Sequence, residues 1–120
     1  MKVAIVGSRK AYDLNFEKII QNIPDNCSEI VSGGSGNVDL LAEKFAKNKN
    51  IKFKCFLPEY KKYGKVAPLI RNIQIIEYSD IVLAFWDKVS KGTKFVIKEA
   101  LKRDMPVKTI YVDSQNSIFN

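Results

Sequence analysis

Short, continuous apolar runs alternate along this 120-residue chain with segments whose apolar residues recur at helical spacing. Such runs are typical of buried strands, and the periodic segments are typical of amphipathic helices. The predicted strands are Lys2–Val6, Glu29–Ser32, Lys52–Phe56, Asp80–Trp86 and Val107–Val112. The predicted helices are Asn15–Ile23, Val38–Asn48, Ala67–Tyr78 and Gly92–Arg103. Residues Pro58–Val66 are predicted to form an irregular, aromatic and basic loop.

Strands that alternate with helices indicate right-handed crossovers and a parallel sheet. The nearly continuous apolar stretches VAIV and IVLAFW agree, because central parallel strands are buried on both faces. We therefore predict an α/β fold, a Rossmann-like three-layer sandwich with a mainly parallel five-stranded sheet and helices on both faces. Residues 1–112 are predicted to form one domain, and residues 113–120 a C-terminal tail.

Residue usage excludes several classes of protein. The chain has no histidine, which excludes a His-containing zinc site and a serine–histidine triad. Cys27 and Cys55 form no CxxC pair and are predicted to be reduced thiols, with Cys55 a small core residue. No apolar run approaches the roughly 20 residues that span a membrane. We predict a cytoplasmic protein with no membrane partner, no metal site and no required cofactor.

The formal net charge of +7 favours anionic partners, from phosphorylated small molecules to nucleic acid. Several of the lysines fall on predicted helix faces, which is typical of a solvated surface. The positive charge therefore does not choose among these partners.

A glycine-rich segment, Ser32-Gly33-Gly34-Ser35-Gly36, follows the second predicted strand and precedes a helix. Glycines let a phosphate approach the backbone, and a helix N-terminus supplies unpaired N–H groups. Gly92-Thr93 offers a second cradle of the same kind. The segment matches neither the P-loop nor the dinucleotide fingerprint, and glycines also make tight strand–helix turns.

Further polar and basic residues fall at or near the carboxyl ends of the predicted strands, where ligands bind in parallel sheets. Arg9 and Arg71 are candidate phosphate clamps, because a guanidinium grips two oxygens at once. Asp39 either complements the helix dipole or accepts hydrogen bonds from ribose hydroxyls. Three aromatic side chains are candidates for stacking on a base, namely Tyr60, Tyr63 and Trp86.

Five ordered segments resemble the SLOG superfamily, which joins the DNA-processing protein DprA/Smf to the LOG-type phosphoribohydrolases, and its small YspA-like branch in particular. They are Val6-Gly7-Ser8-Arg9, Ser32-Gly33-Gly34 with Gly36 and Asp39, Tyr63-Gly64-Lys65 with Ala67, Arg71-Asn72, and Ala84-Phe85-Trp86-Asp87 with Ser90, Gly92 and Thr93. The resemblance implies a nucleotide pocket and a homodimer. With the strand-end residues, it predicts seventeen ligand-binding positions: Gly7, Ser8, Arg9, Ser32, Gly33, Gly34, Ser35, Gly36, Asp39, Lys65, Arg71, Asn72, Trp86, Asp87, Ser90, Gly92 and Thr93.

The chain departs from the LOG-type enzymes at one position. Val96 stands where the resemblance places their catalytic glutamate, and N-glycosidic cleavage usually needs a carboxylate near the anomeric carbon. Three functions remain open. The first is binding of a phosphorylated nucleotide or nucleotide-derived ligand, such as an ADP-ribose-like or cyclic nucleotide signal, by a sensor, sponge or binding module. The second is nucleotide N-glycoside hydrolysis with Asp87 or Asp39 as the catalytic carboxylate. The third is DprA-like binding of single-stranded DNA.

Overall fold

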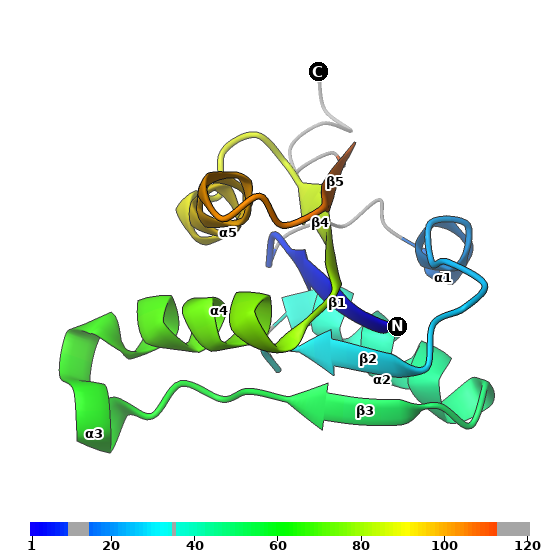
Figure 1. The fold of residues 1–120 in the computed structure, drawn as a ribbon, viewed down its shortest axis with the longest axis horizontal. Coiled ribbons are helices and arrows are strands. Elements are labelled where there is room, and N and C mark those ends of the chain that lie inside the picture. The colour runs from blue at the N-terminus through cyan, green and yellow to red at the C-terminus, as the bar shows by residue number, and fades with distance from the viewer. Residues whose placement is uncertain (10–14, 35, 113–120) are drawn as a thin grey trace.

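Five parallel strands form one sheet in the order β3-β2-β1-β4-β5 (Figure 1). The protein is represented by a computed structural model, which describes residues 1–9, 15–34 and 36–112. The strands are β1 (Lys2–Gly7), β2 (Glu29–Ser32), β3 (Lys52–Cys55), β4 (Ile81–Trp86) and β5 (Val107–Tyr111). Every neighbouring pair is parallel. The predicted Rossmann-like α/β sheet of five strands is confirmed, while the predicted tail, residues 113–120, lies outside the described residues.

Helices cover both faces of the sheet. They are α1 (Phe16–Ile20), α2 (Gly36–Asn48), α3 (Tyr60–Tyr63), α4 (Ala67–Tyr78) and α5 (Lys91–Lys102), with a 3₁₀ turn, η1 (Gly64–Val66), between α3 and α4. Helices α1 and α2 pack on one face, whereas α4 and α5 pack on the other. None of the helices in the described ranges is long and apolar enough to cross a membrane.

Two hydrophobic cores lie on opposite faces of the same strands. Val3 and Ile5 of β1 join the core beneath α1 and α2, while Ala4 and Val6 join the core beneath α4 and α5. Successive side chains of a strand point to opposite faces, so a strand covered on both sides must be apolar throughout. The continuous apolar runs of β1 and β4 have this cause.

The segment Pro58–Val66 is not the irregular loop that we predicted. It contains α3 and η1, which lead directly into α4. Helix α3 ends at Tyr63, and Gly64 after it has a φ of 61°, which suits glycine. The helix has only four residues, too few to show a helical period. Pro58 and Gly64, which flank this short helix, therefore led to the prediction of a loop.

Two other predictions also differ from the structure. Helix α1 is shorter than predicted: Asn15 accepts a hydrogen bond from the backbone N–H of Lys18 at its start, and the helix ends before Gln21. Cys55 is exposed rather than part of the core, because β3 is an edge strand that lacks a neighbour on one side. Cys27 is half-buried, and both cysteines are free thiols.

Close packing at the end of β1 explains why position 7 is glycine. A Cβ atom on Gly7 would lie 2.6 Å from Cγ2 of Val38 and 2.9 Å from the carbonyl oxygen of Phe85. Helix α2 and strand β4 therefore approach this strand end more closely than any side chain permits. At Gly92, by contrast, a Cβ atom would meet nothing within 4 Å.

We predict that Gly7→Ala lowers the free energy of unfolding by about 1–3 kcal/mol, the usual cost of overpacking. Gly92→Ala is the matched control, and its effect should stay within about 1 kcal/mol because alanine favours a helix. Urea unfolding of the two variants measures both values. Equal stabilities would contradict the close packing at β1.

Candidate functional site

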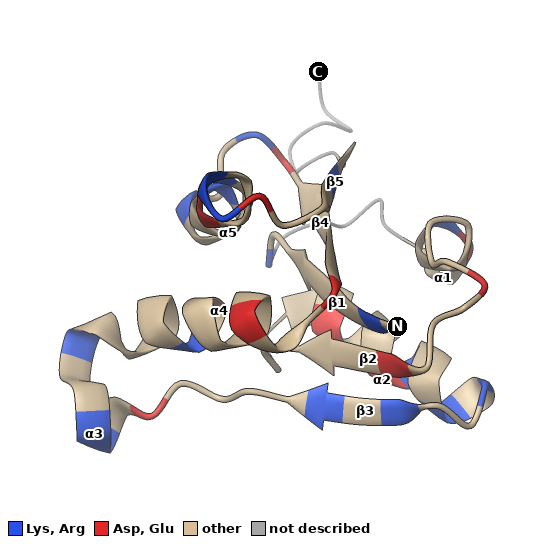
Figure 2. Ribbon diagram, in the orientation of Figure 1, with Lys and Arg blue, Asp and Glu red and all other residues tan. Residues whose placement is uncertain are grey.

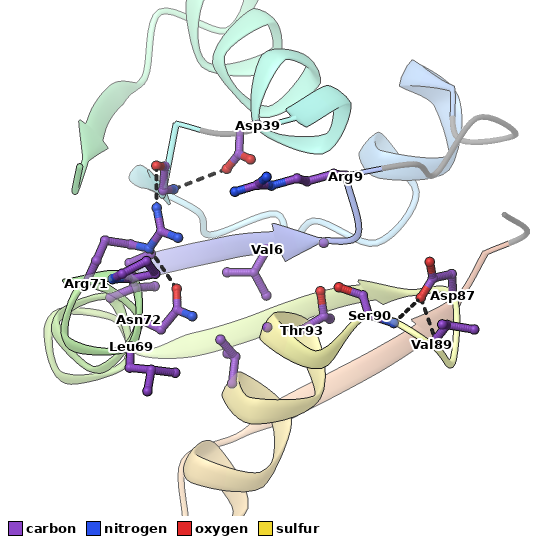
Figure 3. Close-up of a pocket in the computed structure, with 16 residues that line it drawn as sticks. Val6, Arg9, Asp39, Leu69, Arg71, Asn72, Asp87, Val89, Ser90 and Thr93 are labelled. Carbon is purple, nitrogen blue, oxygen red and sulfur yellow. Dashed lines mark hydrogen bonds between the residues drawn. The ribbon is translucent and has the colours of Figure 1, made fainter. Parts of the chain in front are cut away.

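A pocket of about 410 Å³ opens at the carboxyl ends of β1 and β4. The chain first builds the sheet outward from β1 to β3 and then crosses back to β4 on the other side of β1. Loops on either side of this reversal diverge, and the crevice between them is where such sheets bind ligands. Figure 3 shows the residues that line the pocket, which come from the ends of both strands and from α2, α4 and α5.

Arg71 of α4 forms one wall of the pocket and is buried, with 9% of its surface exposed. Its Nη1 donates to the carbonyl oxygen of Gly33 at 2.7 Å, and its Nε donates to Oδ1 of Asn72 at 2.8 Å. A Cβ atom on Gly33 would lie 2.8 Å from that Nη1, so the guanidinium needs glycine there. Within the described part of the chain, no acceptor bonds its remaining N–H groups.

Arg9 extends from the end of β1 toward Arg71 and Asp39 (Figure 3). Burial lowers the pKa of the Arg71 guanidinium, and the positive charge of Arg9 lowers it further, while the charge of Asp39 acts in the opposite direction. The effect of Asp39 is larger than that of Arg9, so the carboxylate more than offsets the repulsion between the two guanidinium groups.

Asp39 lies in the first turn of α2 and holds the glycine-rich loop in place. Its Oδ1 accepts hydrogen bonds from the Ser32 hydroxyl and from the backbone N–H of Gly33. The Ser32 hydroxyl oxygen in turn accepts from the N–H of Gly34 at 3.3 Å. Gly34 and Gly36 have φ angles of 72° and 82°, which other residues rarely adopt. These bonds give Asp39 a positioning role in the loop.

Asp87 organises the opposite wall, at the end of β4. Its Oδ1 accepts from the backbone N–H groups of Val89 at 2.9 Å and Ser90 at 2.7 Å. Its own N–H donates to the hydroxyl of Ser8 at 3.1 Å, which ties the end of β4 to the end of β1. Partial burial raises the pKa of Asp87, but the hydrogen bonds lower it by more, so its pKa lies below the ordinary value.

The N-terminus of α5 faces the same pocket. Ser90 is its N-cap residue but forms no side-chain capping bond. Thr93, in the first turn, is 4% exposed and lines the pocket, and no hydrogen bond of its hydroxyl joins it to another described residue. The first N–H groups of α5 and this hydroxyl are therefore available as donors.

Ten of the predicted ligand-binding residues line this pocket: Gly7, Arg9, Gly33, Asp39, Arg71, Asn72, Asp87, Ser90, Gly92 and Thr93. Six described ones do not, namely Ser8, Ser32, Gly34, Gly36, Lys65 and Trp86. Ser8 and Ser32 support it through hydrogen bonds, and Gly34 and Gly36 line a smaller hollow of about 210 Å³ beside Cys55. Lys65 is exposed on η1. Ser35 lies outside the described residues.

None of the three aromatic candidates lines the pocket. Trp86 donates from Nε1 to the carbonyl oxygen of Ser90 at 2.9 Å, and its ring packs against Tyr111. Tyr60 is on α3 and is 57% exposed, and Tyr63 ends the same helix. The apolar lining comes from six aliphatic residues: Val6, Pro68, Leu69, Ile75, Val89 and Val96. Val6 and position 96 belong to the resemblance, whereas the other four were not predicted in the site.

The chain is a Rossmann-like α/β protein with a pocket at the carboxyl ends of its strands. Comparison of the chain with protein-family models, with curated proteins and with solved structures finds no match. In residues 1–9, 15–34 and 36–112, no three Cys, Asp or Glu side chains are grouped so that they would hold a metal ion.

The lowered pKa of Asp87 predicts a pH dependence of stability. A carboxyl whose pKa is lower in the folded state stabilises the fold above its unfolded pKa of about 3.9, and this stabilisation disappears as the pH falls through the folded value. Asp87→Asn should therefore cost roughly 0.5–1.5 kcal/mol at pH 7, the worth of the lost charge-assisted bonds.

Thermal or urea unfolding from pH 7 to pH 3 measures this cost. The difference between wild type and Asp87→Asn should be constant down to about pH 5 and shrink below about pH 4. Asp104→Asn, at an exposed turn with a φ of 55° that asparagine tolerates, is the matched control and should show little difference at any pH. A difference at position 87 that grows as the pH falls would contradict the assignment.

Proposed function

We propose that this chain binds a phosphorylated nucleotide or nucleotide-derived ligand in the pocket between β1 and β4. The observation that carries the proposal is the convergence of two guanidinium groups, one of them buried, on a pocket at the topological switch point of the sheet. A buried arginine with unused donors is costly without an anionic partner. Phosphate accepts bidentate hydrogen bonds from such a group.

The other polar wall of the pocket suits the same ligand. The open N-terminus of α5 presents N–H groups and the hydroxyl of Thr93, and the space above Gly92 is empty. Helix N-termini favour phosphate because their free N–H groups carry partial positive charge. A phosphate or a diphosphate is therefore stabilised from two sides.

The apolar residues of the pocket suit a base or a ribose ring. Val6, Ile75 and Val96 are buried and form a floor, and Leu69 is half-exposed at its rim. The volume of about 410 Å³ lies in the range of small-molecule sites, roughly 300–1,000 Å³. An apolar floor beside cationic walls matches the two chemical halves of a nucleotide.

Binding is better supported than catalysis, so we assign the chain the role of a sensor, sponge or binding module. Asp39 is engaged by Ser32 and Gly33, and the carboxyl of Asp87 is held ionised by its hydrogen bonds. A general acid for N-glycoside cleavage needs a raised pKa, whereas the pKa of Asp87 is lowered. Val96 leaves the floor of the pocket apolar.

Nucleotide N-glycoside hydrolysis remains the second candidate, because Asp87 lines the pocket and an ionised carboxylate stabilises an oxocarbenium-like transition state. Chromatography of nucleoside monophosphates after incubation with the protein measures base release. We expect none. Release that Asp87→Asn abolishes would replace our proposal with the hydrolase.

The proposal predicts that nucleotides bind and that the arginines determine their affinity. In thermal-shift and calorimetric titrations, nucleoside mono- and diphosphates, ADP-ribose and cyclic nucleotides should include a ligand that raises the melting temperature, while nucleosides without phosphate should not. Arg9→Gln should weaken that ligand at least about tenfold, since a charge-assisted hydrogen bond contributes about 1.5–3 kcal/mol.

Two control variants sharpen this test. Lys65→Gln removes a charge that lies outside the pocket and should change the affinity less than about twofold. Arg103→Gln does the same at a distant site where Arg103 pairs with Glu77 and Glu99. The proposal fails if no phosphorylated ligand binds at millimolar concentration, or if all three variants weaken binding equally.

A further inference from the structure

The excess positive charge of this chain is concentrated in one segment. Residues 44–65 contain eight lysines and one glutamate, with no arginine or aspartate. The segment therefore carries a charge of +7, which equals the formal net charge of the whole chain. The other residues hold twelve basic and twelve acidic side chains. The charge excess is thus local.

In the fold, this segment forms one side of the molecule. It contains the C-terminal part of α2, the edge strand β3, and α3 with η1. Figure 2 shows the blue segments of β3 and α3 along the lower edge of the view, which follows the longest axis of the molecule. That axis is 41 Å long. The lysines are therefore spread along a line and not gathered at a point.

Four of the eight lysines have local contacts, and two of these, Lys54 and Lys62, lie over aromatic rings of the same segment. Lys44 lies over the ring of Phe16 at 5.0 Å, and Lys47 pairs with Glu43 at 3.3 Å. The six lysines other than Lys44 and Lys47 are exposed, and in the described part of the chain none forms an ion pair with a carboxylate. We call these six the lysine edge: Lys49, Lys52, Lys54, Lys61, Lys62 and Lys65.

Protection of an edge strand explains only part of this arrangement. Lysines on an exposed strand discourage pairing with another chain, which accounts for Lys52 and Lys54. Lys61, Lys62 and Lys65 lie on α3 and η1, outside the sheet, where no strand edge needs protection. Unneutralised like charges repel one another, so a linear polyanion along this side would be attracted to all six.

Aromatic side chains are interleaved with the lysines. The ring of Tyr60, at the start of α3, is largely exposed beside Lys61 and Lys62. Lys54 lies over the ring of Phe56 at 5.1 Å, and Lys62 lies over the ring of Tyr63 at 5.2 Å. Lysines that follow a phosphate backbone, with an exposed ring for a base, are the pattern of proteins that bind single strands.

We propose that the lysine edge binds single-stranded nucleic acid along its phosphate backbone, with Tyr60 stacking on a base. None of the six lysines lines the nucleotide pocket, and neither does Tyr60, although Tyr60 acts electrostatically on Arg71 in the pocket wall. Helix α3 has four residues and is too short to read the major groove of a duplex. Because the six lysines lie outside that pocket, binding of an oligomer to the lysine edge and binding of a nucleotide in the pocket are tested separately.

Fluorescence anisotropy with a labelled 20-nucleotide thymidine oligomer tests the proposal. At about 50 mM salt, the triple variant K61Q/K62Q/K65Q should bind at least about tenfold more weakly than wild type. The slope of log K against log salt should become shallower by about 2, since each phosphate contact to a single strand contributes about 0.7. Tyr60→Ala should weaken binding at least about fivefold with an unchanged slope.

The triple variant K94Q/K98Q/K108Q is the matched control, because it removes the same charge from three exposed lysines on α5 and β5. Its affinity should stay within about threefold of wild type. Equal losses in both triple variants, or no binding of the oligomer at low salt, would overturn the proposal. Tighter binding of a 20-base-pair duplex than of the single strand would also overturn it. The same holds if the protein sediments with phosphatidylserine vesicles but binds no oligomer. Circular dichroism of each variant verifies that it is folded.

Discussion

The contact between the guanidinium of Arg71 and the carbonyl oxygen of Gly33 is the interaction on which the pocket depends. It joins α4 to the loop after β2, two elements 38 positions apart in the chain. The same guanidinium is fixed on its other side by Asn72, and the loop is fixed by Asp39 through Ser32 and Gly33. Loss of Arg71 would leave the buried Gly33 carbonyl without its donor, at a cost of about 1–3 kcal/mol. These contacts hold the positively charged guanidinium of Arg71 in a partly desolvated position.

The rest of the site balances that cation without neutralising it. Asp39 lies nearby, but its Oδ1 is already engaged by the loop, and Arg9 adds a second positive charge. On the far wall, Asp87 uses its Oδ1 on the loop that precedes α5 and leaves the helix N-terminus open. Each carboxylate thus shapes a loop, and the donors of Arg71 and α5 are available to the ligand that we propose. In the structure, the Oδ1 atoms of Asp39 and Asp87 accept hydrogen bonds that position the loops of the pocket.

Parts of the fold and of the pocket could be predicted from the sequence, because some residues have a recognisable pattern along the chain. The sheet was predictable, because strands buried on both faces must be continuously apolar, as β1 and β4 are. Arg9 and Asp87 were predictable as pocket residues, because parallel strands bring their carboxyl ends to one edge. Arg71 was predicted from its place beside Asn72 near a helix start and from the resemblance. The burial of Arg71 against Gly33 was not, since it depends on the approach of α4 to a loop far away in the chain.

Other features gave a misleading signal or none. Lys65 lies next to a tyrosine and a glycine that match the resemblance, yet η1 holds it at the surface, away from the pocket. Three pocket residues have the sequence pattern of ordinary core residues, namely Val6, Ile75 and Val96. They belong to the core beneath α4 and α5 and also line the pocket. The excess of lysine in residues 44–65 is visible by counting, but only the edge position of β3 shows that these side chains share one side of the molecule.

A crystal structure of the protein soaked with adenosine 5′-monophosphate would test the central claim most directly. We expect difference density for the nucleotide in the pocket between β1 and β4, with phosphate oxygens within about 3.2 Å of a guanidinium nitrogen of Arg71 or Arg9. An empty pocket at saturating nucleotide, or a nucleotide bound elsewhere with both arginines unengaged, would contradict it.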